Sequence, residues 1–264
     1  MLPGTTAPAP VKTETVDRLR VQVYADRQGM GRATGKDIAA KITELHEGQE
    51  IIRMVFAAAP SQHEVLDALV AARHIDWARI DVFHMDEYVG LPASAPQSFS
   101  HFLNGKLFHK VVPRTVHLID GGAPDTDAAC RQYAALLTQA PIDIVCLGIG
   151  ENGHIAFNDP PVADFADAAL VKRVQLDAAC RQQQVNDGCF PTLDAVPTEA
   201  LTLTIPALLA GRHLFCVVPG KTKTEAVRNV LRGPVTTACP ASVLRTHPDC
   251  TLYVDPDAYG EPLP

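Results

Sequence analysis

The sequence predicts an α/β fold: a single three-layer α/β/α domain around a mostly parallel, open sheet of the Rossmann-like type. Short apolar runs rich in β-branched residues recur along the chain, and such runs are typical of strands buried on both faces of a parallel sheet. Segments of helical periodicity separate these runs, an order that builds a parallel sheet through helical crossovers. With 264 residues, 47% of them hydrophobic, the chain can bury a core of that size.

The predicted elements follow one another without a dividing linker or an internal repeat. Residues 1–15, which are rich in Pro, Ala and Thr, are expected to form a flexible N-terminal arm, and residues 16–264 the single domain. Helices are predicted where apolar residues recur every three or four positions, and strands where they alternate or run together. The predicted strands are 19–24, 51–59, 80–85, 142–147, 169–176, 200–205, 214–218 and 251–254, and the predicted helices are 35–45, 65–70, 126–138 and 221–231.

Composition and charge argue against several classes of protein. The net charge of −7, from 30 acidic and 23 basic residues, argues against nucleic-acid binding. No apolar run reaches membrane-spanning length and the first residues lack the apolar segment of a secretion signal, so no membrane contact is expected. Seven cysteines at irregular spacings, without a C-x-x-C pair, indicate a reduced, cytoplasmic protein. The ten histidines form no H-x-x-x-H pair, and neither a metal nor a cofactor is expected.

The segment 147–160, LGIGENGHIAFNDP, is the most informative stretch of the sequence. It follows the predicted strand 142–147 and combines three glycines with a histidine, two asparagines and an aspartate. Polar groups on a glycine loop at the end of a buried strand are where open α/β sheets bind ligands. The glycines also match G-x-G-x-x-G, the pattern of a dinucleotide site. That pattern requires a long helix after its third glycine, whereas Pro160 and Pro161 follow too soon here, so the sequence disfavours nucleotide binding.

Asp86 and His154 are the candidate catalytic residues. Asp86 follows the predicted strand 80–85, whose end borders the same edge of a parallel sheet as the loop that carries His154. Asp159 lies five residues after His154, across a turn that can bring the two side chains together, and a nearby carboxylate favours a charged imidazole. Each candidate also has a purely structural interpretation. Asp86 and Glu87 can be solvated or capping acids at a strand end, and His154 can hydrogen-bond the backbone of its own loop.

Two helix starts are candidate anion sites. Ser61-x-x-Glu64 and Thr222-x-x-Glu225 each follow a predicted strand, and their pattern is that of a capping box. The free amides at a helix start also bind anions. Lys223 would lie in the first turn of the second helix, where a cation opposes the helix dipole unless an anion is bound. A phosphate or carboxylate ligand and an ordinary solvated turn both remain open at this position.

Three segments carry a family resemblance: HMDEYVGL at 84–91, the loop at 148–159 and the turn at 218–223. They resemble the corresponding motifs of glucosamine-6-phosphate deaminases, in the same order, and the similarity extends from residue 51 to the C-terminus. The broader group includes 6-phosphogluconolactonases and sugar-phosphate isomerases. The lactonases usually carry an arginine where this chain has Tyr88, which favours the deaminase branch.

The resemblance implies a metal-free conversion of glucosamine 6-phosphate and water to fructose 6-phosphate and ammonia by acid–base chemistry. By the same resemblance, Asp86 moves a proton between C2 and C1. His154 opens the sugar ring, assisted by Asn152 and Asp159. The residues that would bind the substrate and its phosphate are Ser61, Gln62, Gly153, Arg181, Gln184 and Lys223.

The sequence departs from the family pattern where the phosphate would bind. AAPSQ at 58–62 replaces a Thr-Gly-Gly-x-Thr-like loop, and Pro60 removes an amide donor. Gln184 stands at the position of a phosphate-binding arginine, with Arg181 one helical turn away. Asp159 replaces the usual glutamate and is a methylene shorter. The resemblance therefore leaves the phosphate end of the substrate open.

Three alternatives stand beside the deaminase. The same chemistry can act on a different hexosamine, the site can hydrolyse a lactone as 6-phosphogluconolactonases do, or the fold can serve as a non-catalytic sugar-phosphate sensor. The presence of both Asp86 and His154 favours an enzyme, with a sugar phosphate as its small-molecule partner. Assembly into a homo-oligomer is compatible with the sequence.

Overall fold

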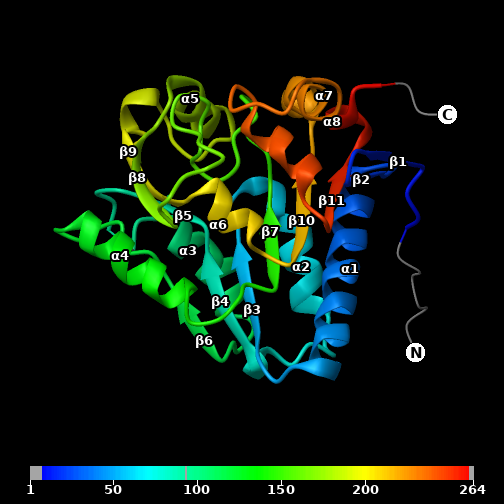
Figure 1. Ribbon diagram of the computed structural model, residues 1–264, viewed down its shortest axis with the longest axis horizontal. Coiled ribbons are helices and arrows are strands. Elements are labelled where there is room, and N and C mark those ends of the chain that lie inside the picture. The colour runs from blue at the N-terminus through cyan, green and yellow to red at the C-terminus, as the bar shows by residue number, and fades with distance from the viewer. Residues whose placement is uncertain (1–7, 93, 262–264) are drawn as a thin grey trace.

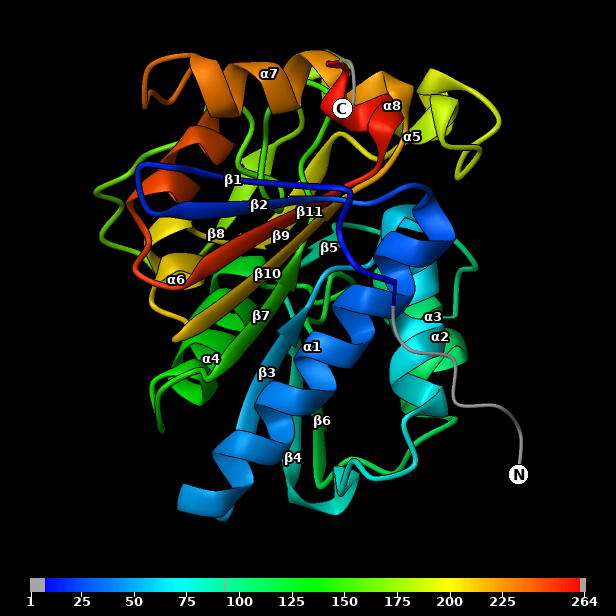
Figure 2. The same cartoon turned by 90° about the vertical axis from the view of Figure 1, so that its right-hand side faces the viewer.

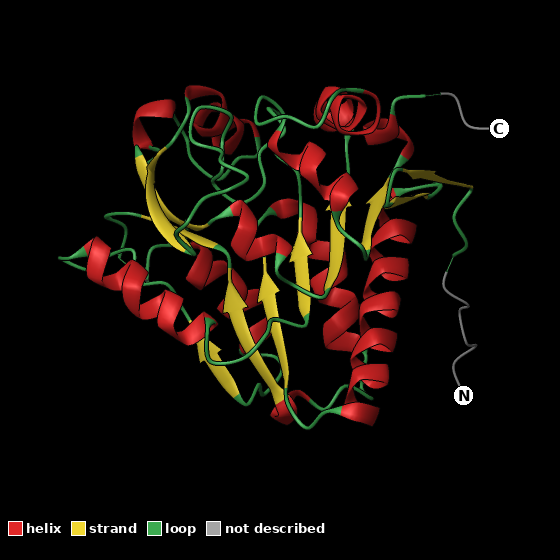
Figure 3. Ribbon diagram, viewed as in Figure 1, coloured by secondary structure: helices red, strands yellow, loops and turns green. Residues whose placement is uncertain are grey.

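The computed structural model describes residues 8–92 and 94–261, and in this part of the chain an eight-stranded sheet forms the centre of the molecule (Figure 1). Neighbouring strands are parallel except for β1 and β2, and the parallel strands point toward one edge of the sheet (Figure 3). In spatial order the strands are β1 (Lys12–Val16), β2 (Leu19–Val23), β11 (Cys250–Val254), β10 (His213–Val218), β7 (Ile144–Leu147), β3 (Ile52–Phe56), β4 (Ile80–His84) and β6 (Thr115–His117).

Helices cover both faces of this sheet and complete three layers (Figure 2). The helices of one face are α1 (Arg27–Gly48), α2 (His63–Ala71) and the short α3 (Phe99–Leu103), and those of the other face are α4 (Thr126–Leu137), α6 (Ile205–Leu209) and α7 (Thr224–Arg232). Beyond the strand ends, at the top of Figure 1, lie α5 (Ala178–Asn186) and α8 (Pro256–Tyr259). Successive strand residues point to opposite faces, so Met54 and Phe56 join one apolar core and Val55 the other. The predicted α/β/α fold class is confirmed.

A second, three-stranded sheet lies beside the strand ends. It consists of β5 (Asp86–Tyr88), β9 (Glu199–Leu203) and β8 (Val171–Gln175), paired antiparallel. The predicted strands 169–176 and 200–205 therefore exist but leave the central sheet. In β8 only Val171 and Val174 are buried and the other three residues are partly or fully exposed, so this strand is less buried than the strands of the central sheet. Only Met85 separates β4 from β5, so the chain turns from one sheet into the other at the position of Asp86.

The N-terminal region corrects the prediction of a flexible arm. Residues 1–7 lie outside the described residues, but Lys12–Val16 form β1, an edge strand that pairs antiparallel with β2. Lys12 lies over the ring of Tyr259 at 4.4 Å from its centroid, and Arg232 forms an ion pair with Glu14 at 3.3 Å. The polar composition concealed this strand, because an edge strand needs backbone partners more than apolar side chains.

Helix α1 begins eight residues before the predicted start at residue 35. Asp26 caps it by accepting a hydrogen bond from the amide of Gly29 at 2.6 Å. Its glycines permit close packing on α2, because a Cβ at Gly31 would lie 2.2 Å from the Cβ of Glu64 and one at Gly35 would lie 2.4 Å from that of Ala68. Neither this 22-residue helix nor another helix in residues 8–92 and 94–261 is long and apolar enough to cross a membrane.

Candidate active site

A cavity of about 280 Å³ lies at the carboxyl ends of the central strands. Its walls come from segments that follow β3, β4, β7 and β10, together with the start of α1. Strand order reverses between β3 and β7, since β4 extends the sheet to one side and β10 to the other. Open α/β sheets bind ligands in the crevice at such a reversal. The side chains that carry the argument below and line the cavity are Arg27, Ser61, Asp86, His154, Gln184 and Lys223.

Asp86 is a buried carboxylate that faces this cavity. It is 6% exposed and follows β4 through the single residue Met85. Burial raises the pKa of Asp86 well above its ordinary value, and the charge of the neighbouring Glu87 raises it further. A carboxyl group in this state can hold a proton and release it at a ligand.

Glu87 points the other way and has a structural task. Its carboxylate accepts hydrogen bonds from the amides of Tyr88, Phe99 and Ser100 at 2.9–3.0 Å, and from the Ser100 hydroxyl at 2.8 Å. These bonds fix the start of α3. The capping interpretation of the Asp-Glu pair is therefore correct for Glu87, whereas Asp86 is left to the cavity.

His154 lines the same cavity and is held from behind by two oxygen atoms. Its Nδ1 lies 2.9 Å from Asp159 Oδ1 and 2.7 Å from Asn152 Oδ1. Two acceptors at Nδ1 require the proton on that nitrogen and leave Nε2 for a ligand. The ring lies flat against Gly150, where a Cβ would approach it to 2.1 Å. The glycine of the loop thus makes room for the imidazole.

Asp159 is ionised beneath this histidine. It is fully buried, and burial by itself would raise the pKa of Asp159. The hydrogen bond and charge of His154, with hydrogen bonds from Asn152 at 3.0 Å and from the amide of Asp177 at 3.2 Å, outweigh burial and lower the pKa. The shorter side chain reaches the imidazole directly, so the aspartate replaces the glutamate of the family pattern without losing the contact.

Lys223 is a buried basic residue that lines the cavity. It is 7% exposed, and its Nζ has no hydrogen-bond partner among the described residues. Burial lowers the pKa of Lys223, against the opposing charges of Asp187 and Glu151. Ser61 lines the cavity nearby, since its Oγ would lie 3.3 Å from a Cβ at Gly148. A buried ammonium group without a partner favours an anionic ligand.

Several predicted binding residues lie outside the cavity lining. Gln62 is buried behind it and donates to Ser61 Oγ at 3.1 Å, so it orients that hydroxyl. Gly153 makes the loop turn with a φ of +83° and packs against Cys239. Arg181 lies outside the cavity lining as well: its guanidinium donates to the carbonyls of Leu193 at 2.7 Å and Val196 at 3.0 Å. Gln184, three residues after Arg181 on α5, lines the cavity.

The two predicted capping boxes are also wrong. A 3₁₀ turn precedes each helix, at Pro60–Gln62 before α2 and at Lys221–Lys223 before α7, and neither helix has a side-chain cap. The extra turn moves each helix start beyond the position that the serine or threonine would cap. Glu64 instead forms an ion pair with Arg27 at 2.8 Å.

Two groups near the site were not predicted from the sequence. Arg27 lines the cavity from the first residue of α1, and its only signal was a charged residue soon after a strand end. Cys180 places its sulfur with His154 and Asp159 in a group of possible metal ligands, all within 4.8 Å of one another. Burial, and then the charge of Asp159, raise the pKa of the Cys180 thiol well above its ordinary value, which favours the neutral thiol.

Residues 25–253 match the family of glucosamine-6-phosphate isomerases and 6-phosphogluconolactonases. A glucosamine-6-phosphate deaminase of Listeria welshimeri is 36% identical over 201 residues, covering 76% of this chain and 84% of that protein. One of Lactobacillus delbrueckii subsp. bulgaricus is 33% identical over 221 residues, covering 83% and 89%.

Solved structures show the same fold. A monomeric glucosamine-6-phosphate deaminase superposes with a TM-score of 0.83 at 28% identity, covering 91% of this chain and 98% of that one. A 6-phosphogluconolactonase of Thermotoga maritima superposes with a TM-score of 0.73 at 23% identity, covering 92% and 100%. The family match, the identity to the deaminases and the shared fold agree, and the chain belongs to the glucosamine-6-phosphate isomerase/6-phosphogluconolactonase family.

Proposed function

We propose that this protein is a cytoplasmic enzyme that converts glucosamine 6-phosphate and water to fructose 6-phosphate and ammonia, with residues 16–264 as one catalytic domain. The observation that carries the proposal is the meeting of Asp86, His154 and Lys223 on one cavity. A proton-carrying carboxyl group, a histidine with a buried carboxylate behind it, and a buried cation are the groups that this reaction requires. The names of the 33–36% identical relatives support the same substrate.

His154 would open the sugar ring. Its Nε2 takes the proton of the anomeric hydroxyl and returns a proton to the ring oxygen, so one imidazole acts first as base and then as acid. Asp159 stabilises the charged imidazole between the two steps, and Asn152 holds both side chains in place.

Asp86 would then carry the isomerisation. It removes the proton at C2 of the open-chain amino aldose and returns a proton to C1. In the same isomerisation O1 gains a proton and the amino nitrogen loses one, so the aldehyde with its 2-amino group becomes a 2-imine with a hydroxyl group on C1. Water adds to C2, the C–N bond breaks, and ammonia leaves with its proton balance closed by that water. The raised pKa of Asp86 suits a group that must both accept and donate a proton.

Ser61 and His154 meet the same short loop. Ser61 lies beside Gly148, and the ring of His154 lies on Gly150. Two residues of chain span at most about 7 Å, so the contacts of these two side chains with the loop are close together. In the proposed binding mode the phosphate on C6 contacts Lys223 and Ser61, and C1 and C2 lie at His154 and Asp86.

The test is ammonia release from glucosamine, galactosamine and mannosamine, each with and without a 6-phosphate. We expect the fastest release from glucosamine 6-phosphate, with fructose 6-phosphate as co-product. Hydrolysis of 6-phosphogluconolactone without ammonia release from any hexosamine would assign the lactonase reaction instead. Tight sugar-phosphate binding in calorimetry without turnover would make the protein a sensor.

A further inference from the structure

Arg27 is a cation in the cavity that the proposed reaction does not use. It is the first residue of α1, and its guanidinium donates from Nε to Glu64 Oε1 at 2.8 Å and from Nη2 to the carbonyl of Pro60 at 2.6 Å. The side chain is 40% exposed and lines the cavity. These two bonds hold the guanidinium at the cavity wall and leave Nη1 for another acceptor.

The position of Arg27 is fixed by the packing of two helices. Gly31, one turn along α1, touches the backbone and Cβ of Glu64 so closely that a methyl group would not fit. Asp26 caps the same helix start. Because Arg27 and its partner Glu64 are both held by backbone packing, the guanidinium needs little ordering when a ligand binds.

Arg27 lies where the turn before α2 is poor in donors. Pro60 has no amide hydrogen, yet its carbonyl is the group that Arg27 contacts. Gln184, which also lines the cavity, is neutral. A guanidinium at this place supplies N–H donors that proline lacks and a positive charge that glutamine lacks.

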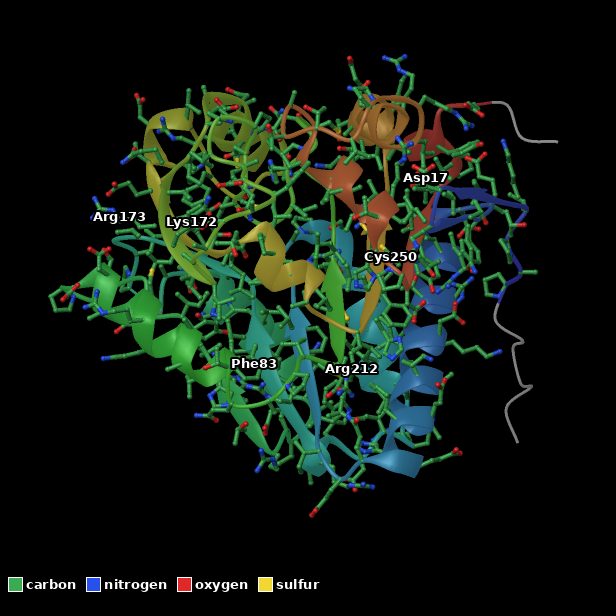
Figure 4. The ribbon with its side chains drawn as sticks, in the orientation of Figure 1. Asp17, Phe83, Lys172, Arg173, Arg212 and Cys250 are labelled. Carbon is green, nitrogen blue, oxygen red and sulfur yellow. The ribbon has the colours of Figure 1, made fainter. Side chains whose placement is uncertain are left out.

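The charge balance of the cavity also calls for an anion. Arg27, Lys221 and Lys223 line it, together with two acids, the buried Asp86 and the exposed Asp187. Lys223 Nζ has no partner among the described residues. At the opposite edge of the sheet Arg212, labelled in Figure 4, forms an ion pair with Asp143 at 3.1 Å. Arg212 and Arg27 are thus each paired with a carboxylate, whereas the buried ammonium group of Lys223 has no partner among the described residues.

We propose that Arg27 binds the phosphate group of the sugar substrate, together with Lys223 and Ser61, and thereby sets the preference for a phosphorylated hexosamine. The inference rests on the proposed function for the identity of the sugar. Glu64 positions the guanidinium from behind, and the phosphate takes the face that looks into the cavity. A planar guanidinium offers two parallel N–H donors to phosphate oxygens, which a lysine cannot do.

The test compares R27A and R27K with R32A, which removes an exposed arginine of the same helix. For R27A we expect KM for glucosamine 6-phosphate to rise about 10- to 100-fold with kcat within about threefold. KM for unphosphorylated glucosamine should not change. R27K should fall between wild type and R27A, and R32A should match wild type. An equal loss of kcat/KM with both sugars would overturn the assignment.

E64Q separates phosphate binding from a merely structural ion pair. It removes the charge of the positioning carboxylate and keeps the arginine, so we expect KM for glucosamine 6-phosphate to rise clearly less than in R27A. If E64Q and R27A raise this KM equally, Arg27 matters only as the partner of Glu64, and the inference is wrong.

Thermal stabilisation by inorganic phosphate tests the site without catalysis. Wild type and R32A should gain in melting temperature with millimolar phosphate relative to chloride at equal ionic strength, and R27A should gain clearly less. If no hexosamine is turned over and this difference remains, the proposed function fails and the anion site stands. Equal stabilisation of R27A and wild type, or none in either, would refute the site.

Discussion

Asp86 and Glu87 are adjacent acids that the strand turns to opposite sides. Asp86 faces the cavity, and Glu87 accepts four hydrogen bonds at the start of α3. The second carboxylate helps to raise the pKa of the first. A structural acid thus tunes the group to which we assign the proton transfer.

We predict that Asp86→Asn lowers deamination by about 10²- to 10⁴-fold, the usual contribution of a general acid–base group. The amide keeps the shape of the site, so substrate should still raise the melting temperature of the variant. Ammonia release and a thermal shift with glucosamine 6-phosphate measure the two properties. Activity within about tenfold of wild type would contradict the assignment.

The stability of the same variant relative to wild type should increase as pH rises. The pKa of Asp86 is higher in the folded protein than in the unfolded chain, so folding favours its protonated form. That contribution is fully present below the unfolded pKa and is lost as pH rises through the raised folded pKa. An asparagine side chain does not titrate, so the variant does not lose stability in this way. The melting temperature of Asp86→Asn relative to wild type should therefore increase from pH 5 to pH 8, and a constant difference would show that the carboxylate is not destabilised by burial.

We predict that His154→Gln separates ring opening from proton transfer. Turnover of the cyclic substrate should fall by about 10²- to 10⁴-fold, because the imidazole is the group that exchanges protons with the ring oxygen. Deuterium exchange at C1 and C2 of an open-chain analogue should persist, since that step belongs to Asp86. Nuclear magnetic resonance in deuterated water measures the label. Equal loss of both activities would mean that the histidine has no separate task.

At the scale of elements, the packing of α1 on α2 determines one wall of the cavity. Gly31 and Gly35 bring the two helices into contact, and this contact places Arg27 beside Glu64. The π turn after α3 (Asn104–Phe108) packs on α2 as well. The helix pair is therefore both a core contact and the support of the cationic end of the site.

We predict that Gly35→Leu destabilises the protein by about 1–3 kcal/mol, because the first added carbon already lies 2.4 Å from the Cβ of Ala68. Gly48→Ala is the matched control, since nothing lies within 4 Å of its added Cβ. Urea denaturation gives both free energies of unfolding. Similar midpoints for the two variants would show that the helices can separate without cost.

At the scale of the whole molecule, β1 contacts segments from the C-terminal part of the chain at one edge of the central sheet. β1 covers the edge of β2, and its residues Lys12 and Glu14 contact Tyr259 and Arg232. The cavity lies over the middle of the sheet, at β3, β7 and β10. The edge therefore contributes to stability and solubility more than to chemistry.

We predict that a variant beginning at residue 17 melts about 3–10 °C lower than wild type and aggregates more readily, because β2 becomes an open edge. Its kcat/KM should stay within about threefold of wild type, as no cavity residue is removed. A variant beginning at residue 8 keeps every described contact and serves as the control. Equal melting temperatures of the two variants, measured by calorimetry, would show that β1 adds no stability.

The sequence by itself determined the central strands and the reacting end of the site. A strand buried on both faces must be apolar, so Ile144–Leu147 and His213–Val218 were visible as short hydrophobic runs. Asp86 and His154 were predicted because polar residues directly after such strands meet at one edge of a parallel sheet. A local sequence pattern carries this information, because each strand and the polar residues that follow it are neighbours in the sequence.

Tertiary structure alone decided that Arg27 lines the cavity and which partners the outer strands pair with. Arg27 reaches the cavity because α1 packs on α2, and 33 residues separate it from Pro60. On α5, Gln184 lines the cavity, whereas the guanidinium of Arg181 contacts the carbonyl of Leu193 outside it. The pattern of β8 fits any half-buried sheet, and only pairing with β9 made it antiparallel. These outcomes depend on contacts between distant segments, and no local pattern encodes which distant segment a residue will meet.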